Sequence, residues 1–155
     1  MKLTHIDDEG NARMVDITEK KETQREARAY GQVKMSAGTY SVIKTGKGPK
    51  GDIFTVAKIA GIMATKKTHE IIPLCHPLSL THVDVDYSFD DRKHVVGITS
   101  TVRTKGQTGV EMEAINCAMI VALTIYDMCK AVDKGIELGP FYLLEKSGGK
   151  SGKFV

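Results

Sequence analysis

The stretch from residue 80 to residue 103 most constrains how this 155-residue chain can fold. Apolar and polar residues alternate over residues 80–89 and again over residues 94–103, which is typical of strands with one buried face. The run Asp90-Asp91-Arg92-Lys93 between them predicts a polar turn. We therefore expect a β-hairpin, and with it an antiparallel sheet.

A long helix is predicted over residues 111–132, where apolar residues recur at helical spacing. Gly135 follows it, and we expect this glycine to be the C′ residue that ends the helix. The predicted buried stripe consists of Ile115, Met119, Ala122 and Tyr126, with Ala118 and Cys129 beside it.

Local capping chemistry marks two helices in the first half of the chain. Ser36 follows an alternating strand-like stretch (residues 27–35) and is an N-cap for a short helix over residues 37–44. Asp52 is a natural N-cap for a second helix that continues to about residue 67. Its apolar positions are Ile53, Val56, Ala57, Ala60 and Ala64.

A final strand is predicted over residues 136–145. The element order is then strand, helices, strand, strand, helix, strand, which matches the split βαβ pattern. We expect an α+β fold, a ferredoxin-like sandwich whose antiparallel sheet has its helices packed on one face. A single domain over residues 23–146 would follow a poorly ordered arm (1–22) and precede a flexible tail (147–155).

Composition excludes several classes of protein. The 22 basic and 19 acidic residues give a net charge of only +3, too mild for binding nucleic acid by bulk charge. The first eight residues lack the apolar core of a secretory signal, and the apolar run over residues 117–123 is too short to span a membrane. Three cysteines without a CxxC pair fit reduced thiols, so we expect a cytoplasmic protein without nucleic-acid or membrane partners.

A glycine-rich segment before the second helix contains Lys47 and Lys50. Backbone N–H groups at a helix start, together with two lysines, make a favourable phosphate site. The alternative is an exposed turn whose lysines only solubilise the chain.

The two prolines Pro73 and Pro77 fix a loop that contains Cys75 and His76. Such a loop suits a positioned acid, base or hydrogen-bond donor. Zinc is a sharper alternative, because His69 and His82 are close in sequence, but the spacing fits no structural zinc pattern. We expect no metal, while a histidine that only packs remains an open alternative.

Acidic residues mark both ends of the long helix. Glu111 and Glu113 occupy its first turn, where capping is the simplest explanation, but the helical rotation places them on different faces. Near its end, Asp127 and Lys130 are three residues apart and face one another. Asp127 lies in an apolar stretch, so we expect it to be partly buried and suited to proton transfer.

Taken together, these stretches resemble the cyclic pyranopterin monophosphate synthase family of molybdenum cofactor biosynthesis. The similar segments follow the family's order over nearly the whole chain: MVDI (14–17), KGD (50–52), AKIAGI (57–62), IPLCHPL (72–78), GQTGVEMEA (106–114), ALTIYDMCKAV (122–132) and KSGGKSG (146–152).

The resemblance implies a lyase that converts 3′,8-cyclo-7,8-dihydro-GTP, made by a separate radical GTP-cyclising enzyme, into cyclic pyranopterin monophosphate and pyrophosphate. It also implies a homohexamer built as a trimer of dimers, with active sites at dimer interfaces and no cofactor. A non-catalytic nucleotide-binding module of the same fold is the alternative, and a zinc hydrolase is a third.

The resemblance also implies roles for individual residues. The catalytic positions are Asp127, Lys130 and Lys50. The substrate-binding positions are Leu74, Cys75, His76, Met112, Glu113, Arg25 and Lys66. The lysines and the arginine would neutralise the charge of the leaving pyrophosphate, while Asp127, Lys130 and His76 would move protons.

Overall fold

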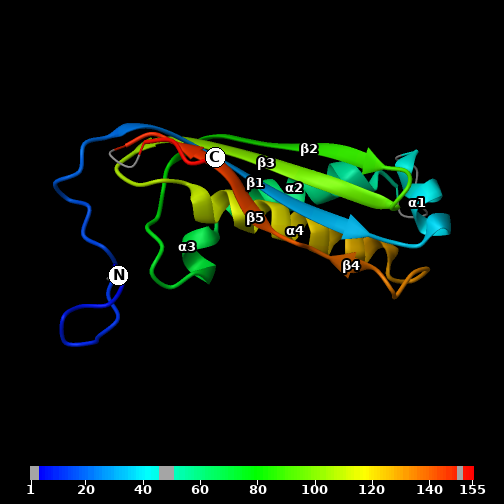
Figure 1. Cartoon of the computed structure of the whole chain (residues 1–155), viewed down its shortest axis with the longest axis horizontal. Coiled ribbons are helices and arrows are strands. Elements are labelled where there is room, and N and C mark those ends of the chain that lie inside the picture. Colours follow the sequence, from blue (N-terminus) through cyan, green and yellow to red (C-terminus); the bar gives the residue numbers. More distant parts are fainter. Residues whose placement is uncertain (1–3, 46–50, 150–151) are drawn as a thin grey trace.

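The computed structural model describes residues 4–45, 51–149 and 152–155 (Figure 1). An antiparallel sheet runs the length of the molecule in the order β2-β3-β1-β4, and β5 also pairs with β1. The strands are β1 (Thr23–Lys34), β2 (Leu80–Asp90), β3 (Val95–Gly106), β4 (Glu137–Leu138) and β5 (Tyr142–Ser147).

The predicted hairpin is confirmed as β2 and β3, which pair up to Asp90 and Val95. The Asp90 carboxylate closes the turn by accepting the backbone N–H groups of Arg92 and Lys93. Strand β1 then pairs with β3 without interruption from Thr23 opposite Gly106 to Lys34 opposite Val95. The first strand of the chain is therefore central to the sheet.

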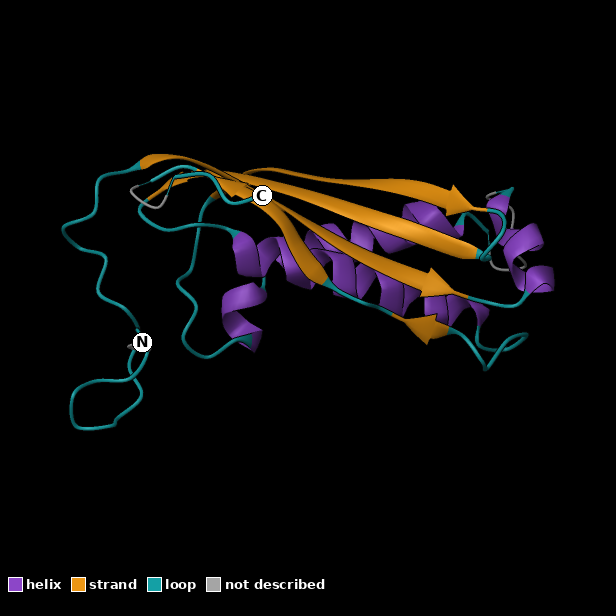
Figure 2. Ribbon diagram, in the orientation of Figure 1, coloured by secondary structure: helices purple, strands orange, loops and turns teal. Residues whose placement is uncertain are grey.

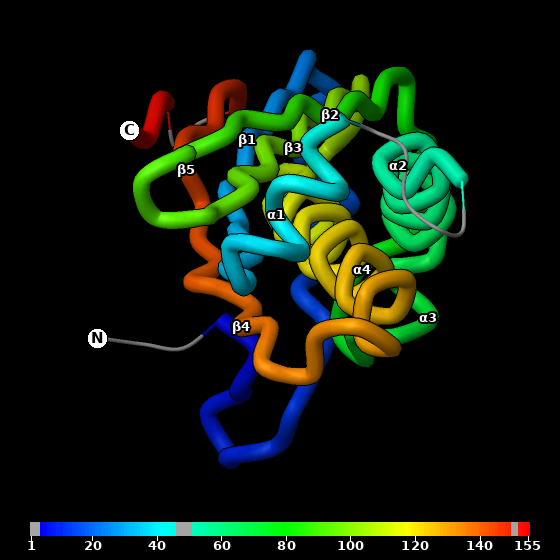
Figure 3. Tube along the Cα trace, turned by 90° about the vertical axis from the view of Figure 1, so that its right-hand side faces the viewer, coloured from blue at the N-terminus to red at the C-terminus, as the bar shows by residue number. Residues whose placement is uncertain are grey.

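Helices lie on one face of this sheet and leave the other face open (Figures 2 and 3). They are α1 (Ala37–Lys44), α2 (Ile53–Thr65), α3 (Thr68–Ile71) and α4 (Glu111–Cys129). Strand β3 lies between β1 and β2, and β1 lies between β3 and β4, as the split βαβ pattern requires. The predicted ferredoxin-like fold class is confirmed.

Both predicted N-caps are present. The Ser36 hydroxyl accepts the backbone N–H of Thr39, and the Asp52 carboxylate accepts that of Thr55. The first helix has the predicted bounds, and α2 ends at Thr65 with Lys66 as its C-cap. Capping depends on residues within one turn, which is why the sequence was informative here.

Two predictions about element bounds were wrong, and one short helix was missed. Helix α4 ends at Cys129, so Gly135 is not its C′ residue. The final strand is divided into β4 and β5 by Gly139 and Pro140, because proline has no N–H to donate and Gly139 has a φ of +97°. The four-residue helix α3 had not been expected.

The buried face of α4 also differs from the predicted stripe. Met119 is 46% exposed, and Ile115 and Tyr126 are only partly buried. The helix packs against both the sheet and α2, so its buried face is broad; it includes Ala114, Cys117, Ala118, Val121, Ala122, Ile125 and Cys129. On α2, Val56 likewise points outward, whereas Ile53 and Ala57 are buried.

The C-terminal segment folds back along the sheet. Phe154 pairs with Lys146 through two backbone hydrogen bonds of 3.0 Å. At the other end of the chain, residues 4–22 contain an isolated bridge between Ile6 and Ala12 and no named helix or strand.

Helix α4 is long and apolar enough, by length and composition alone, to cross a membrane. Its contacts are those of a core helix, since it packs on β1 and β3 and along the antiparallel α2. The two helices pack tightly at Gly61, where an added Cβ would lie 2.5 Å from Val121 Cγ2 and 3.1 Å from Cys117 Sγ.

We predict that Gly61→Val lowers the free energy of unfolding by about 3 kcal/mol, because the new side chain overpacks this crossing. Gly38→Val is the matched control, since a Cβ at Gly38 meets no atom within 4 Å. Urea unfolding monitored by circular dichroism measures both effects. Equal midpoints for the two variants would contradict the role given to Gly61.

Candidate active site

The first turn of α4 places a carboxyl group in the interior. Glu113 is only 4% exposed. Burial raises its pKa to about 7, and the negative charge of Glu111 adds to the shift, although a backbone hydrogen bond opposes it. Glu111 points elsewhere and forms an ion pair of 2.7 Å with Lys146 of β5. The prediction that the two glutamates lie on different faces is therefore confirmed.

The loop bounded by Pro73 and Pro77 lies beside Glu113. Burial raises the pKa of the Cys75 thiol, and the charge of Glu113 raises it further. This thiol is therefore protonated at neutral pH and provides a weak hydrogen-bond donor rather than a nucleophilic thiolate. Leu74 in the same loop is half-buried, and Met112 on α4 is partly exposed.

The ring of His76 contacts the N-terminal arm. His76 Nε2 lies 2.7 Å from the carbonyl oxygen of Val15. A carbonyl can only accept a hydrogen bond, so Nε2 carries the proton. In the neutral ring, Nδ1 is then left with a lone pair that can accept a proton from a substrate.

Arg25 holds two chain segments together near the start of α4. Its guanidinium donates to the carbonyl oxygens of Gly106, Gln107 and Gly148, at 3.1 to 3.3 Å. It thereby joins the turn that leads into α4 to the segment that follows β5. Arg25 could bind a phosphate only through guanidinium N–H groups that these three bonds do not use, or after one of the three bonds has broken.

A second group of predicted residues lies at the opposite end of α4. Lys130 Nζ and Asp127 Oδ1 are 2.6 Å apart, as their spacing predicted, and the hydrogen bond that Lys130 donates to Asp127 raises the pKa of Lys130. The expectation that Asp127 is partly buried was wrong, because its side chain is 63% exposed. The apolar residues around it face the core or α1, whereas Asp127 points outward at the last turn.

Helix α2 links the two ends of α4. Gly61 lies against Cys117 and Val121, and because the helices are antiparallel, the start of α2 lies beside the Asp127 end of α4. The exposed Lys66, at the other end of α2, is then near the Glu113 end. Lys50, which precedes α2, lies outside the described residues.

A single chain does not bring all the predicted residues together. Glu113 and Asp127 are 14 residues apart on one helix, which corresponds to about 21 Å along its axis. We call the residues near the start of α4 the N-terminal group: Arg25, Lys66, Leu74, Cys75, His76, Met112 and Glu113. The residues near the end of α4, Asp127 and Lys130, form the C-terminal group.

Comparison with known proteins identifies the family. The model of the MoaC family matches residues 14–149, which is most of the chain. The chain belongs to the MoaC family.

Several MoaC relatives named "Cyclic pyranopterin monophosphate synthase" are similar over nearly their whole length. The protein from Pelotomaculum thermopropionicum is 55% identical over 152 residues, which cover 98% of this chain and 89% of the relative. The protein from Roseiflexus sp. is 54% identical over 99% of this chain and 97% of the relative. The protein from Listeria innocua is 54% identical over 98% and 94%, respectively.

Two residues next to the N-terminal group of this MoaC protein were not among the predicted site residues. Glu111, at the start of α4, forms an ion pair with Lys146 of β5, and Arg25 donates to Gly148 two residues further along the chain. Sequence gave a partial signal, because Lys146 begins the KSGGKSG segment and Glu111 begins α4. Their pairing depends on a contact across 35 residues.

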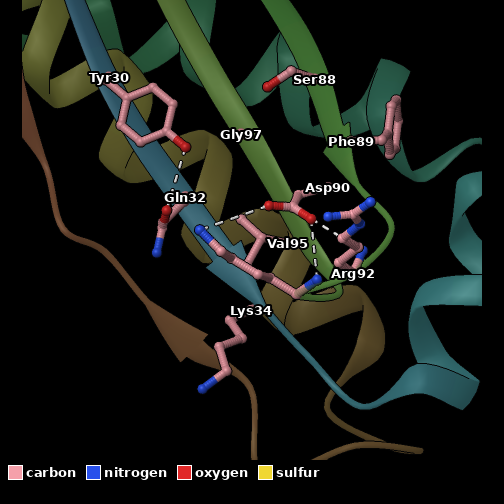
Figure 4. A pocket seen from close by; sticks show the side chains of 10 residues that line it. Tyr30, Gln32, Lys34, Ser88, Phe89, Asp90, Arg92, Val95 and Gly97 are labelled. Atoms are coloured by element: carbon pink, nitrogen blue, oxygen red, sulfur yellow. Dashed lines mark hydrogen bonds and ion pairs between the residues drawn. The ribbon is translucent and has the colours of Figure 1, made fainter.

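Two surface hollows among the described residues are lined by side chains outside both groups. A hollow of about 780 Å³ lies on the open face of the sheet between Tyr30, Gln32, Ser88 and Asp90 (Figure 4). A second, apolar hollow of about 470 Å³ lies between α1 and the end of α4, where Met128 and Cys129 line it next to Asp127. Among the described residues, no group of three or more His, Cys, Asp or Glu side chains is placed to hold a metal.

We predict a pH-dependent stability from Glu113. Its pKa is about 7 in the folded chain and 4.5 when exposed, so its stabilising effect is complete below pH 4.5 and is lost as the pH rises through 7. A shift of this size corresponds to about 3 kcal/mol. Urea unfolding of the wild type and Glu113→Gln between pH 5 and 8 should show the wild type losing stability relative to the variant. A carboxyl ¹³C titration of Glu113 with a midpoint near 4.5 would contradict this.

Proposed function

We propose that this MoaC protein is a cyclic pyranopterin monophosphate synthase. It converts 3′,8-cyclo-7,8-dihydro-GTP into cyclic pyranopterin monophosphate and pyrophosphate, in molybdenum cofactor biosynthesis. The observation that carries the proposal is the identity of 52–55% over at least 98% of the chain to relatives with that name. These relatives favour the enzyme over a non-catalytic nucleotide-binding module.

The two ends of α4 supply complementary chemistry. Asp127 and Lys130 form an exposed acid–base pair that a substrate can reach, beside the start of α2, where backbone N–H groups favour phosphate. Glu113, with a pKa near 7, can both give and take a proton at neutral pH. His76 Nδ1 and the Cys75 thiol add an acceptor and a donor.

Lysine side chains neutralise the negative charge on the leaving pyrophosphate. Loss of pyrophosphate and closure of a cyclic phosphate concentrate negative charge on oxygen atoms. Lys50 and Lys66 are the lysines assigned to this role, and Lys66 is the C-cap of α2. Arg25 contributes chiefly by fixing the turn before α4, because three carbonyl oxygens already engage its guanidinium.

We further propose that each active site is shared between two chains. Residue 120 is midway between Glu113 and Asp127, so a twofold axis near it would place the start of one α4 beside the end of its partner's. Met119 and Leu123, on either side of residue 120, are about half exposed and point outward within about 80° of Asp127. An apolar contact there fits such an antiparallel pairing.

A homohexamer arranged as a trimer of dimers needs a second kind of interface. Helix α2 has a separate exposed apolar stripe of Val56, Ile59 and Met63, on the side that faces away from Gly61 and α4. This stripe supports a second contact between chains. We propose the hexamer on these two surfaces and on the family resemblance.

The proposed reaction needs no cofactor, because it moves protons and phosphoryl groups without a change of redox state. The substrate is supplied by a separate radical enzyme that cyclises GTP. We place the reaction in the cytoplasm, with no nucleic-acid or membrane partner. The biosynthetic name of the relatives and the packing of α4 as a core helix support this placement.

The direct test is incubation of the purified chain with 3′,8-cyclo-7,8-dihydro-GTP, followed by mass analysis for cyclic pyranopterin monophosphate and a pyrophosphate assay. We expect both products at a ratio of one to one, and we expect Lys50→Ala to be strongly impaired while it keeps the same oligomeric mass. The Listeria innocua relative, assayed in parallel, controls for substrate quality. Binding of the substrate without conversion, while that relative turns it over, would leave the binding module as the correct function.

Mixed oligomers test the shared site. Glu113→Ala and Asp127→Ala chains, unfolded together in equal amounts and refolded, should recover activity that neither variant has alone. In randomly formed dimers, about a quarter of all sites would combine an intact Glu113 with an intact Asp127 from the other chain. If mixed oligomers confirmed by native mass spectrometry are as inactive as both parents, the two residues belong to one chain's site.

A further inference from the structure

The junction between α2 and α3 carries Lys66 in a tight connection. Helix ends leave carbonyl groups without intrahelical partners. Here the carbonyl oxygen of Ala64 accepts the N–H of Lys67 at 2.9 Å, and that of Thr65 accepts the hydroxyl of Thr68 at 3.1 Å. Thr65 and Thr68 are almost fully buried on either side of the exposed Lys66.

A side chain from α4 completes this junction. Asn116 Nδ2 lies 3.1 Å from the carbonyl oxygen of Ala64 and 3.0 Å from Thr68 Oγ1. Because a carbonyl can only accept, the NH₂ group of the amide must face the junction, and its two hydrogens serve the two oxygens. Asn116 therefore caps the end of α2 and the start of α3 from a neighbouring helix.

A chain of hydrogen bonds continues from this cap to the loop beside Glu113. The carbonyl oxygen of Thr68 accepts the N–H of Ile72 at 2.9 Å, and the carbonyl oxygen of Ile72 accepts the N–H of Cys75 at 3.1 Å. The Cys75 thiol in turn lies near enough to Glu113 for the negative charge of that residue to raise the pKa of the thiol. Asn116 and Glu113 are on successive turns of α4, three residues apart.

We propose that Asn116 is a positioning residue, which fixes Lys66 and the loop of Leu74, Cys75 and His76 relative to the α4 turn that carries Met112 and Glu113. This inference rests on the proposed function, because Lys66 and the loop residues are assigned to the substrate site there. Asn116 touches backbone and hydroxyl oxygens and acts on the substrate only through the groups it holds.

Loss of the two hydrogen bonds should cost activity out of proportion to stability. A misplacement of about 1 Å in a substrate-contacting group lowers turnover about 100-fold. Asn116→Leu keeps the size of the side chain but removes both donors. Asn116→Thr keeps one hydroxyl donor, and it serves as the milder variant should the leucine variant fold poorly.

A double-mutant cycle with Lys66→Ala distinguishes positioning from a general loss of stability. We expect Asn116→Leu to lower kcat/KM about 10- to 100-fold in the wild-type background, but by a smaller factor when Lys66 is already alanine, because only the loop of Leu74, Cys75 and His76 is then left to misplace. The matched control is Tyr40→Phe, which removes a 2.7 Å hydrogen bond to Asp91 that involves no proposed site residue. It should leave kcat/KM unchanged in both backgrounds.

Amide hydrogen exchange supplies a readout that does not depend on activity. In Asn116→Leu, exchange at Lys67, Ile72 and Cys75 should accelerate at least tenfold, while amides in the middle of α4 keep their wild-type rates. In Asn116→Thr, both exchange and kcat/KM should lie between those of the wild type and the leucine variant.

These experiments distinguish failure of the proposed function from failure of the positioning role of Asn116. Failure of the wild type to convert 3′,8-cyclo-7,8-dihydro-GTP would refute the proposed function, whereas unchanged exchange at residues 67–75 would refute the positioning role whatever the activity. Equal losses of kcat/KM in the two Lys66 backgrounds would overturn the positioning of Lys66, because Asn116 would then act without it. Wild-type kcat/KM in Asn116→Leu would have the same consequence.

Discussion

The close crossing of α2 and α4 at Gly61 is the contact on which the arrangement of the candidate site depends. Because this glycine has no Cβ, the two helices approach until Val121 and Cys117 occupy the space a side chain would need. The crossing sets the register of one helix against the other. It therefore determines that α2 begins beside Asp127 and that its end, with Lys66, lies within reach of Asn116. The position of Lys66 therefore depends on this crossing together with the other buried contacts of α2.

Helix α4 separates the chemistry of the molecule into two environments. At one end Glu113 is buried and its pKa is raised towards neutrality, and at the other Asp127 and Lys130 are paired in contact with solvent. A rigid helix cannot bring its own ends together, so the distance between the groups is fixed by the number of residues between them. Assembly with a second chain is the simple way to combine the two environments, and the half-exposed Met119 and Leu123 lie between them.

Sequence predicted the parts of this structure that local chemistry determines. The N-caps Ser36 and Asp52, the β2–β3 hairpin and the bounds of α1 each depend on a few neighbouring residues. It failed where tertiary packing decides. Helix α4 packs on the sheet and on α2 with other residues, so Met119 lies on the side that is left open to solvent. Asp127 is exposed because the last turn of α4 points its carboxylate outward. The candidate site residues were proposed through the family resemblance, but the hydrogen bond from Arg25 to Gly148 spans 123 residues and has no sequence pattern.

That bond also bears on how the chain is made. Arg25 lies on the first strand of the domain, while Gly148 follows the last strand. Strand β1 pairs with β3, β4 and β5, so its partners are synthesised 61 or more residues later. A chain still growing on the ribosome can close the hairpin and pack α2 on α4, but its Arg25 guanidinium has no third carbonyl until Gly148 emerges. The bond from Arg25 to the segment after β5 thus forms only after Gly148 has been synthesised, and a nascent chain that has not reached this residue holds the turn before α4 through the carbonyls of Gly106 and Gln107 alone.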